Sequence, residues 1–167
     1  QLEHATQTAI LAEKENYHIE VVLAAFFHDI GHLLIYDNNN IETMGEYGVM
    51  NHEIVGAEYL KDLGFEDILC NLVKNHILTK RYLITKDPNY YNNLSNASKN
   101  TFEYQGGLLT NNEIIEFEND PLFKIHLKLR EWDDYAKDTS QQMKDIIIKK
   151  EPINYYYNMT KKYIFNY

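Results

Sequence analysis

The sequence of 167 residues has few of the residues that cross-link or restrict a chain: one cysteine, three prolines and seven glycines. Because Cys70 is the single cysteine, an intrachain disulfide is impossible, and a metal site built from several thiolates is excluded. A chain without disulfides fits the reducing cytoplasm, where we expect this protein to be located. The longest apolar stretch, around Val21–Phe27, is far shorter than the roughly 20 residues that span a bilayer, so we expect no membrane partner.

Positive charge is also scarce. Sixteen Lys and Arg residues stand against 25 Asp and Glu residues, and the formal net charge is −9. Nucleic-acid binding depends on clustered Lys and Arg side chains that neutralise phosphates, so we expect no nucleic-acid partner. An acidic chain can still bind a small anion in a local basic pocket.

Alternation typical of paired strands is absent, and apolar residues instead recur at helical spacing. The first predicted helix covers Gln1–Glu15. The apolar run Glu20–Phe27, followed by the letters HDIGHLL, predicts a second and buried helix. Gly31 and the cluster Asn38–Asn40 then interrupt the pattern.

Capping residues predict the next two helices. Asn51 is a good N-cap and Gly64 a good terminating residue, so a third helix is expected between them. A fourth follows at about Glu66–Ile77. The segment Lys80–Asn93 contains Pro88 and several Asn and Tyr residues, and we interpret it as a loop.

The second half of the chain carries further helix signals. Ser95–Tyr104 could form a short helix, Thr110–Glu113 matches a capping box, and Asp120–Pro121 is a strong helix start. Ser140 can cap one more helix. With no linker or repeat in between, the expected fold is all-α, a single helical bundle covering residues 1–167.

The adjacent pair His28-Asp29 lies at the end of the predicted buried helix. Burying an ionised carboxylate beside an imidazole is costly unless a compensating charge is present, and a metal cation supplies that charge. The alternative is that both residues simply cap a helix end. The dipeptide alone leaves this alternative open.

Three more histidines and a late aspartate favour a metal site over a helix-capping role for His28-Asp29. Imidazole and carboxylate together suit Zn, Mn, Fe or Co. One ion would need only the first histidine, the His-Asp pair and the late aspartate, so His52 and His76 argue for a second ion. The candidate ligands, in chain order, are His4, His28, Asp29, His52, His76 and Asp133.

The remaining histidines have other interpretations. His18 lies in a polar turn and is expected to be solvated. His126 lies two turns before Asp133 and is interpreted as structural or as a surface residue. His32 follows the ligand pair closely, so it should lie near the metals without necessarily binding them.

Several segments together resemble the PhnZ-type HD-domain oxygenases, which are mixed-valence di-iron enzymes of organophosphonate catabolism and distant relatives of myo-inositol oxygenase. The pattern of histidines and aspartates alone is shared with HD-domain phosphohydrolases, so the segments after the fourth histidine are the more specific. The matching segments are LEHATQTA (2–9), FFHDIGHLL (26–34), NHEIVGAEYL (51–60), VKNHILTKRYL (73–83), LSNASKNTFEYQGG (94–107) and LREWDDYAK (129–137).

The resemblance implies a role for each site residue, with two iron ions in the Fe(II)/Fe(III) state as cofactors. Asp29 would bridge both ions, His4, His28 and Asp133 would complete one site, and His52 and His76 the other. Lys80 lies four residues after His76, one turn away if that helix continues. It could then face the same pocket and supply the cation that a phosphonate dianion needs. The implied substrate-contacting residues are His32, Lys80, Ser98 and Gln105.

The implied activity is O2-dependent cleavage of the C–P bond of a 1-hydroxy-2-aminoethylphosphonate, or of its N-methylated analogue. The products would be phosphate and glycine, or the analogous N-methylated amino acid, and an upstream phosphonate hydroxylase could supply the substrate. The main alternative is a phosphohydrolase in which two metal ions activate water. A third possibility is a catalytically silent HD domain that binds a ligand or partner.

One family feature falls outside the sequence. The family carries a Tyr and a Glu upstream of the first ligand histidine, as a lid over the active site. The chain begins at Gln1, inside a predicted helix and three residues before His4, so we expect that an N-terminal segment precedes it. The amine selectivity, the oligomeric state and the role of the Tyr/Asn/Lys-rich C-terminal segment stay open.

Overall fold

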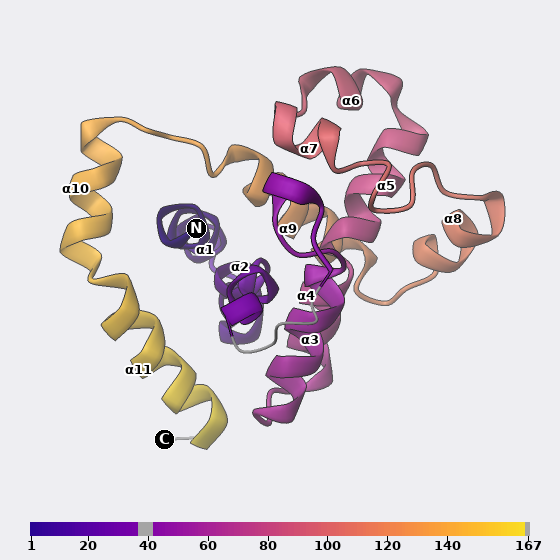
Figure 1. The fold of residues 1–167 in the computed structure, drawn as a ribbon. Coiled ribbons are helices and arrows are strands. Elements are labelled where there is room, and N and C mark those ends of the chain that lie inside the picture. Colours follow the sequence, from indigo (N-terminus) through magenta and orange to yellow (C-terminus); the bar gives the residue numbers. More distant parts are fainter. Residues whose placement is uncertain (37–41, 166–167) are drawn as a thin grey trace.

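The computed structural model describes residues 1–36 and 42–165, and in this part of the chain all the regular structure is helical (Figure 1). The all-α fold class is therefore confirmed. A single isolated bridge, between Thr43 and Val49, is the one strand-like pairing among these residues. The interruption predicted at Asn38–Asn40 lies outside the described residues.

Eleven α-helices and two short 3-10 helices follow one another along the described chain. None of these helices has the length and apolar character needed to cross a bilayer. The elements are α1 (Leu2–Lys14), α2 (Ile19–Phe27), η1 (Ile30–Tyr36), η2 (Gly45–Tyr47), α3 (His52–Asp62), α4 (Asp67–Lys74), α5 (His76–Lys86), α6 (Pro88–Asn93), α7 (Asn96–Asn100), α8 (Asn111–Glu118), α9 (Phe123–Tyr135), α10 (Gln141–Lys150) and α11 (Pro152–Phe165).

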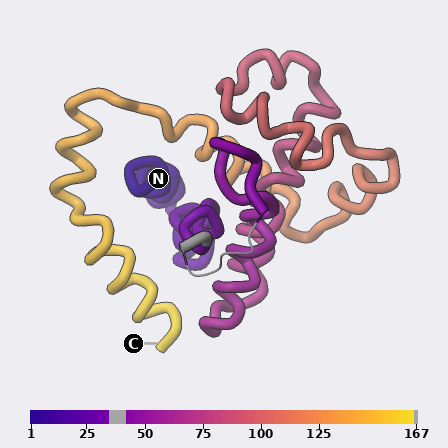
Figure 2. Tube along the Cα trace, viewed as in Figure 1, coloured from indigo at the N-terminus to yellow at the C-terminus, as the bar shows by residue number. Residues whose placement is uncertain are grey.

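The main hydrophobic core lies where α1, α2, α4 and α9 meet. Leu23, Leu69 and Leu129 are each fully buried there, and Trp132 is almost so. The C-terminal helices α10 and α11 run along the other side of α1 and α2 (Figures 1 and 2). The Tyr156 ring of α11 is fully buried in the same core.

Two glycines let η1 approach α3 very closely. A Cβ atom on Gly31 would lie 2.0 Å from the carbonyl oxygen of His52, and one on Gly56 would lie 3.0 Å from the amide nitrogen of Gly31. Only residues without side chains permit this backbone contact. The contact brings Asp29, at the start of this turn, next to the first residue of α3.

The predicted helix signals hold at several positions. Thr110 and Glu113 form the complete capping box of α8, and the Ser140 side chain accepts a hydrogen bond from the amide of Met143 at the start of α10. Gly64 has a φ of +89° just after α3, as expected for a terminating glycine. Asn51 precedes α3, but its side chain makes no capping hydrogen bond.

The interpretation of Lys80–Asn93 as a loop is wrong. Helix α5 continues to Lys86 because its apolar side chains, including those of Tyr82 and Ile84, are buried against two small hydrophobic clusters. Helix α6 starts at Pro88, where proline is tolerated in the first turn, and the Asp87 side chain accepts a hydrogen bond from the amide of Asn89.

Two predicted boundaries also shift. The helix expected at Glu66–Ile77 ends at Lys74, and α5 begins at His76 after a single intervening residue, Asn75. Helix α9 begins at Phe123 rather than at Asp120–Pro121, because the Asp120 side chain instead forms a tight turn by accepting a hydrogen bond from the amide of Leu122.

Candidate metal centre

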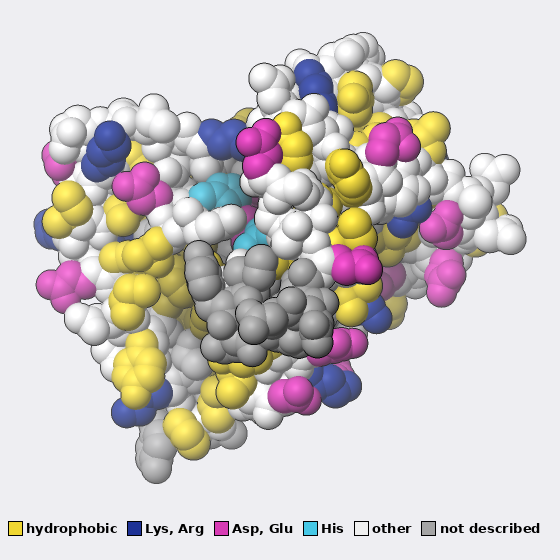
Figure 3. Space-filling view, viewed as in Figure 1, with side chains coloured by type: hydrophobic (Ala, Val, Ile, Leu, Met, Phe, Trp, Pro, Cys, Tyr) yellow, Lys and Arg dark blue, Asp and Glu magenta, His cyan; other side chains and the backbone are white. Residues whose placement is uncertain are grey.

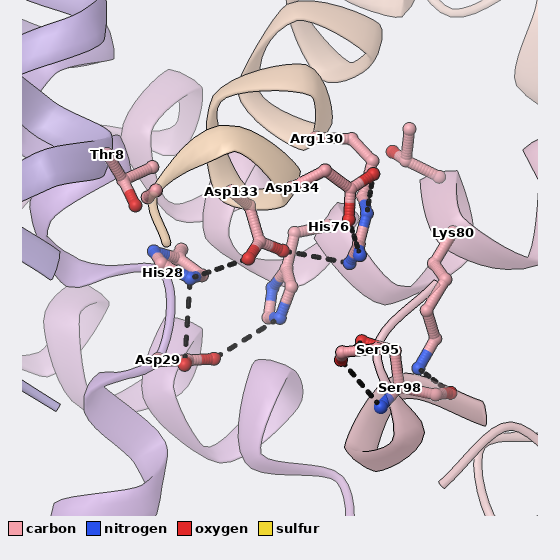
Figure 4. A network of polar contacts seen from close by, with 12 residues as sticks. Thr8, His28, Asp29, His76, Lys80, Ser95, Ser98, Arg130, Asp133 and Asp134 are labelled. Atoms are coloured by element: carbon pink, nitrogen blue, oxygen red, sulfur yellow. Dashed lines mark hydrogen bonds and ion pairs between the residues drawn. The ribbon is translucent and has the colours of Figure 1, made fainter. Parts of the chain in front are cut away.

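The six predicted ligand residues come from five parts of the chain and meet at one place. Figure 4 shows His28, Asp29, His76 and Asp133 among them. His4 lies on α1 near the start of the chain, and Asp133 lies much later, on α9. The pair His28-Asp29 follows the last residue of α2. His52 and His76 are the first residues of α3 and α5.

The first group of ligand-type atoms contains His4, His28 and Asp29. The Nε2 atoms of His4 and His28 are 3.2 Å apart. Oδ1 of Asp133 lies 3.1 Å from Nε2 of His4 and 3.9 Å from Nε2 of His28, so this carboxylate faces the same point. Oδ2 of Asp29 lies 3.6 Å from Nε2 of His28.

The second group contains Asp29, His52 and His76. The Nε2 atoms of the two histidines are 3.1 Å apart. Oδ1 of Asp29 lies 3.4 Å from Nε2 of His52 and 3.7 Å from Nε2 of His76. Asp29 therefore presents one carboxylate oxygen to each group, which is the arrangement of a bridging ligand.

The tautomers of three histidines show that these groups suit cations. Each Nδ1 atom is within hydrogen-bond distance of a backbone carbonyl, which can only accept, so Nδ1 carries the proton and Nε2 presents its lone pair. Nitrogen lone pairs held about 3 Å apart repel unless a cation lies between them. The acceptors are the carbonyl oxygens of Ala136 for His4 (3.0 Å), of Ala25 for His28 (2.9 Å) and of Val73 for His76 (2.7 Å).

Three of the proposed ligands have pKa values shifted toward the forms that bind metal ions. Burial alone would raise the pKa of Asp29, but the neighbouring His28 and the other histidines hold it well below its usual range. Asp133 is buried too, and Arg130 is the main reason why its pKa is low. Burial lowers the pKa of His76 well below its ordinary value. Ionised carboxylates and neutral imidazoles are the forms that bind metal ions.

Both groups open on a cleft of about 540 Å³. Histidine side chains are visible in the hollow of the surface in Figure 3. The predicted substrate-contacting residues also line this cleft, together with Thr101 and Arg130. The four predicted residues are His32, Lys80, Ser98 and Gln105.

Lys80 is almost completely buried in the wall of the cleft. Its Nζ atom donates to Oε1 of Gln105, to Oγ1 of Thr101 at 3.2 Å and to the carbonyl oxygen of Ser98 at 3.4 Å. Burial lowers the pKa of Lys80 to about 7. Its hydrogen-bond acceptors are neutral, so the site can accept an anionic group beside Nζ.

The other histidines lie outside both groups. His32 stacks on His52 with ring centroids 3.8 Å apart, and its Nδ1 atom accepts a hydrogen bond from the amide of Val49. His126 is buried, and its Nε2 atom lies 3.4 Å from a carboxylate oxygen of Asp120. His18 is exposed at the start of α2.

The prediction from sequence missed Arg130. It is buried and pairs with Asp133 three residues later and Asp134 four residues later. This spacing on a helix is a readable signal for an ion pair. Tyr90 and Thr101 were also missed, and no local pattern points to them, because their partners lie far away in the sequence.

Comparison with known proteins agrees with the geometry. Residues 2–115 match the HD domain family. The chain belongs to the HD domain family. An uncharacterized protein of Acanthamoeba polyphaga mimivirus is 44% identical to it over 164 residues, covering 98% of this chain and 71% of the relative.

Two relatives are named as phosphonate dioxygenases. The hydroxymethylphosphonate dioxygenase of Gimesia maris is 39% identical over 148 residues, covering 87% of this chain and 72% of the relative. The glycine-betaine-forming 1-hydroxy-2-(trimethylamino)ethylphosphonate dioxygenase of Leisingera caerulea is 33% identical over 143 residues, covering 86% and 71%. The chain is therefore an HD-domain homologue of phosphonate dioxygenases.

Proposed function

We propose that this protein is an O2-dependent di-iron oxygenase that cleaves the C–P bond of a 1-hydroxy-2-aminoethylphosphonate or its N-methylated analogue. The products would be phosphate and glycine or the analogous N-methylated amino acid. One observation carries the proposal: two groups of metal-ligand atoms share Asp29 and open on the same cleft as the buried Lys80.

The proposal assigns the ligands by their distances. Asp29 would bridge the two ions through its two oxygens, and His52 and His76 would complete one site. His4, His28 and Asp133 would complete the other site. When bound, an Fe(II)/Fe(III) pair supplies the one-electron chemistry that reduction of O2 requires, and imidazole with carboxylate is a ligand set that suits iron.

The residues of the cleft wall would bind the phosphonate. The protonated Nζ of Lys80 would donate to a phosphonate oxygen, and a dianion beside it favours the charged form of the lysine. Gln105 and Ser98 lie next to this nitrogen and can donate from their amide and hydroxyl groups. His32 lines the same cleft. Together these groups hold the substrate carbon toward the metal ligands.

The named relatives support a phosphonate and leave its second group open. One is named for hydroxymethylphosphonate, which carries no amine, and the other for a trimethylamino compound. A panel of three substrates therefore separates the possibilities: hydroxymethylphosphonate, 1-hydroxy-2-aminoethylphosphonate and its N-methylated analogue.

The test is a phosphate-release assay after anaerobic purification and loading with Fe(II). We expect two iron ions per chain, a mixed-valence EPR signal after brief exposure of the Fe(II)-loaded protein to O2, a change in this signal when substrate is added, and phosphate release that requires O2. His52→Ala should lose one ion and its turnover. His18→Ala, at an exposed histidine outside both ligand groups, should keep two ions and full turnover. Release of phosphate without O2, or full activity with zinc alone, would contradict the proposal.

The assay also addresses the phosphohydrolase alternative. A hydrolase would release phosphate from a phosphate monoester with redox-inactive ions and without O2, because its ions only activate water. We expect no such release here. Observing it, together with no turnover of any phosphonate, would replace the oxygenase assignment by the hydrolase.

A further inference from the structure

Arg130 is a buried cation with more than one partner. Its guanidinium side chain is 3% exposed and lies on α9 beside the proposed metal ligands. Nη1 lies 2.8 Å from Oδ2 of Asp133, and Nη2 pairs with Oδ1 of Asp134. Figure 4 shows the guanidinium between the two carboxylates.

The two oxygens of Asp133 have different surroundings. Oδ2 pairs with Arg130, while Oδ1 faces the histidines, 3.1 Å from Nε2 of His4. This division leaves one oxygen for a metal ion. It depends on where the guanidinium sits, because a planar guanidinium can also engage both oxygens of one carboxylate.

Tyr90 and Asp134 fix the other side of the guanidinium. Nε of Arg130 donates to the hydroxyl oxygen of Tyr90 at 2.9 Å and to Oδ2 of Asp134 at 3.2 Å. The Tyr90 hydroxyl in turn donates to the same oxygen of Asp134. Three groups from two helices, α6 and α9, therefore close a small ring of hydrogen bonds around Nε.

The charges of this cluster support the same conclusion. Asp133 and Asp134 bring two negative charges to one buried guanidinium. Because Asp134 neutralises part of the guanidinium's positive charge, Asp133 keeps more of its negative charge for a cation. Without Asp134, the guanidinium would have Asp133 as its remaining carboxylate partner in this cluster.

We infer that Tyr90 and Asp134 are positioning residues for the ligand Asp133, acting through Arg130 to keep one carboxylate oxygen free for the ion at His4 and His28. The inference rests on the proposed function in taking Asp133 as a metal ligand. Among the described residues, the side chains of Tyr90 and Asp134 form their hydrogen bonds and ion pairs with each other, with Arg130 and with Lys137, and with none of the proposed ligands or substrate-contacting residues. Their effect should therefore be confined to one of the two metal sites.

The experiment is a titration of the metal-free full chain with Fe(II) under anaerobic conditions, with Co(II) as a spectroscopic probe. Asp134→Asn keeps the shape of the side chain and removes its charge, and Tyr90→Phe removes a single hydroxyl. Tyr91→Phe is the matched control, because Tyr91 follows on the same helix but its ring packs against Phe102. Thermal unfolding is measured for every variant.

We expect Asp134→Asn to weaken one of the two binding events about 10- to 100-fold, the usual effect of changing an outer-shell partner of a ligand. Tyr90→Phe should weaken the same event less, and Tyr91→Phe should change neither. The second binding event should keep its wild-type affinity in all three variants, and the Co(II) spectrum should change for one ion only.

Two results would overturn the inference. One is unchanged affinity for both ions in Asp134→Asn and Tyr90→Phe. The other is an equal loss at both sites that follows the loss of thermal stability, which would mean a purely structural role. The proposed function fails separately, if the wild-type protein binds two ions but turns over none of the three phosphonates.

Discussion

The two groups of proposed metal ligands differ in how the chain builds them. His52 and His76 are the first residues of two helices that start 24 positions apart, and their side chains are 4% and 2% exposed. His4 and Asp133 come from α1 and α9 and lie 129 positions apart (133 − 4). Their side chains are 26% and 13% exposed. We call the group with the two nearly buried histidines the enclosed group, although it shares the cleft, while the other group closes only when distant parts of the sequence meet.

The two groups are also stabilised by different means. The enclosed group depends on backbone contact, since Gly31 lets the turn with Asp29 lie against the backbone of His52. The more exposed group depends on polar contacts, since the Arg130 side chain pairs with Asp133 and the backbone carbonyl of Ala136 accepts a hydrogen bond from His4. We therefore expect the enclosed group to tolerate little change of shape and the exposed group to respond mainly to charge.

The largest expected effect comes from removing one ligand of each group. His52→Ala and His4→Ala should each lose one ion and about 1,000-fold in turnover, because one ion contributes several kcal/mol to the reaction. Added imidazole should restore metal and turnover in His4→Ala, where the replaced side chain is 26% exposed, much more than in His52→Ala, where it is 4% exposed. Metal analysis and phosphate release measure both effects.

Equal rescue of both variants would remove the distinction between an enclosed and an open group. Two bound ions and full turnover in His52→Ala would show that the ligand assignment is wrong. His18→Ala serves as the control for replacing an exposed histidine elsewhere.

Lys80 belongs to neither group and tests the cleft that both share. In Lys80→Met, phosphonate binding should weaken by about 100-fold, the equivalent of a lost hydrogen bond to a charged group. In the wild-type protein, the pKa of about 7 means that affinity for a phosphonate falls as the pH rises above 7. The variant should show no such fall. Inhibition by a non-reactive phosphonate at pH 6 to 9 measures this.

Lys80 should also make the free energy of unfolding depend on pH, in the direction opposite to that of the phosphonate affinity. Burial lowers the pKa of Lys80 from 10.5 to about 7, so between these values the unfolded chain binds a proton that the folded chain has released. The contribution of Lys80 to folding stability therefore becomes more favourable as the pH rises through this window. Urea unfolding of the wild-type protein and Lys80→Met at pH 7 and pH 9 isolates it. A constant difference between the two proteins would contradict the low pKa.

Gly31→Ala tests the backbone contact of the enclosed group. The added Cβ would lie 2.0 Å from the carbonyl oxygen of His52, so α3 must move away from Asp29. We expect a loss of about 1–3 kcal/mol in unfolding free energy, as for overpacking, and a weaker ion at His52 and His76. Gly64→Ala is the control, since it meets no neighbour but is strained at a φ of +89°. It should lose stability without changing metal affinity.

The sequence was enough to select candidate ligands that the fold brings together, but not to find the residues that support them. His28-Asp29 could be found because the pair ends an apolar run, and His52 follows the expected N-cap Asn51. His76 was expected inside a helix over Glu66–Ile77, whereas it is the first residue of α5. The helix that carries Lys80 was interpreted as a loop, since the Asn and Tyr residues around Pro88 mask the buried Tyr82 and Ile84. The hydrogen bond between Tyr90 and Arg130 spans 40 positions, and no local pattern encodes such a contact.

The smallest expected effect is in the order in which the two ions leave. A chelator should reach the ion at His4 more easily, because the His4 side chain is 26% exposed while those of His52 and His76 are 4% and 2% exposed. We expect the first ion to dissociate several-fold faster than the second, with His4→Ala abolishing the fast phase and leaving the slow one. Stopped-flow mixing of the loaded protein with a chelator resolves the two phases. A single phase in the wild-type protein would mean that the shared Asp29 couples the ions so tightly that neither leaves alone.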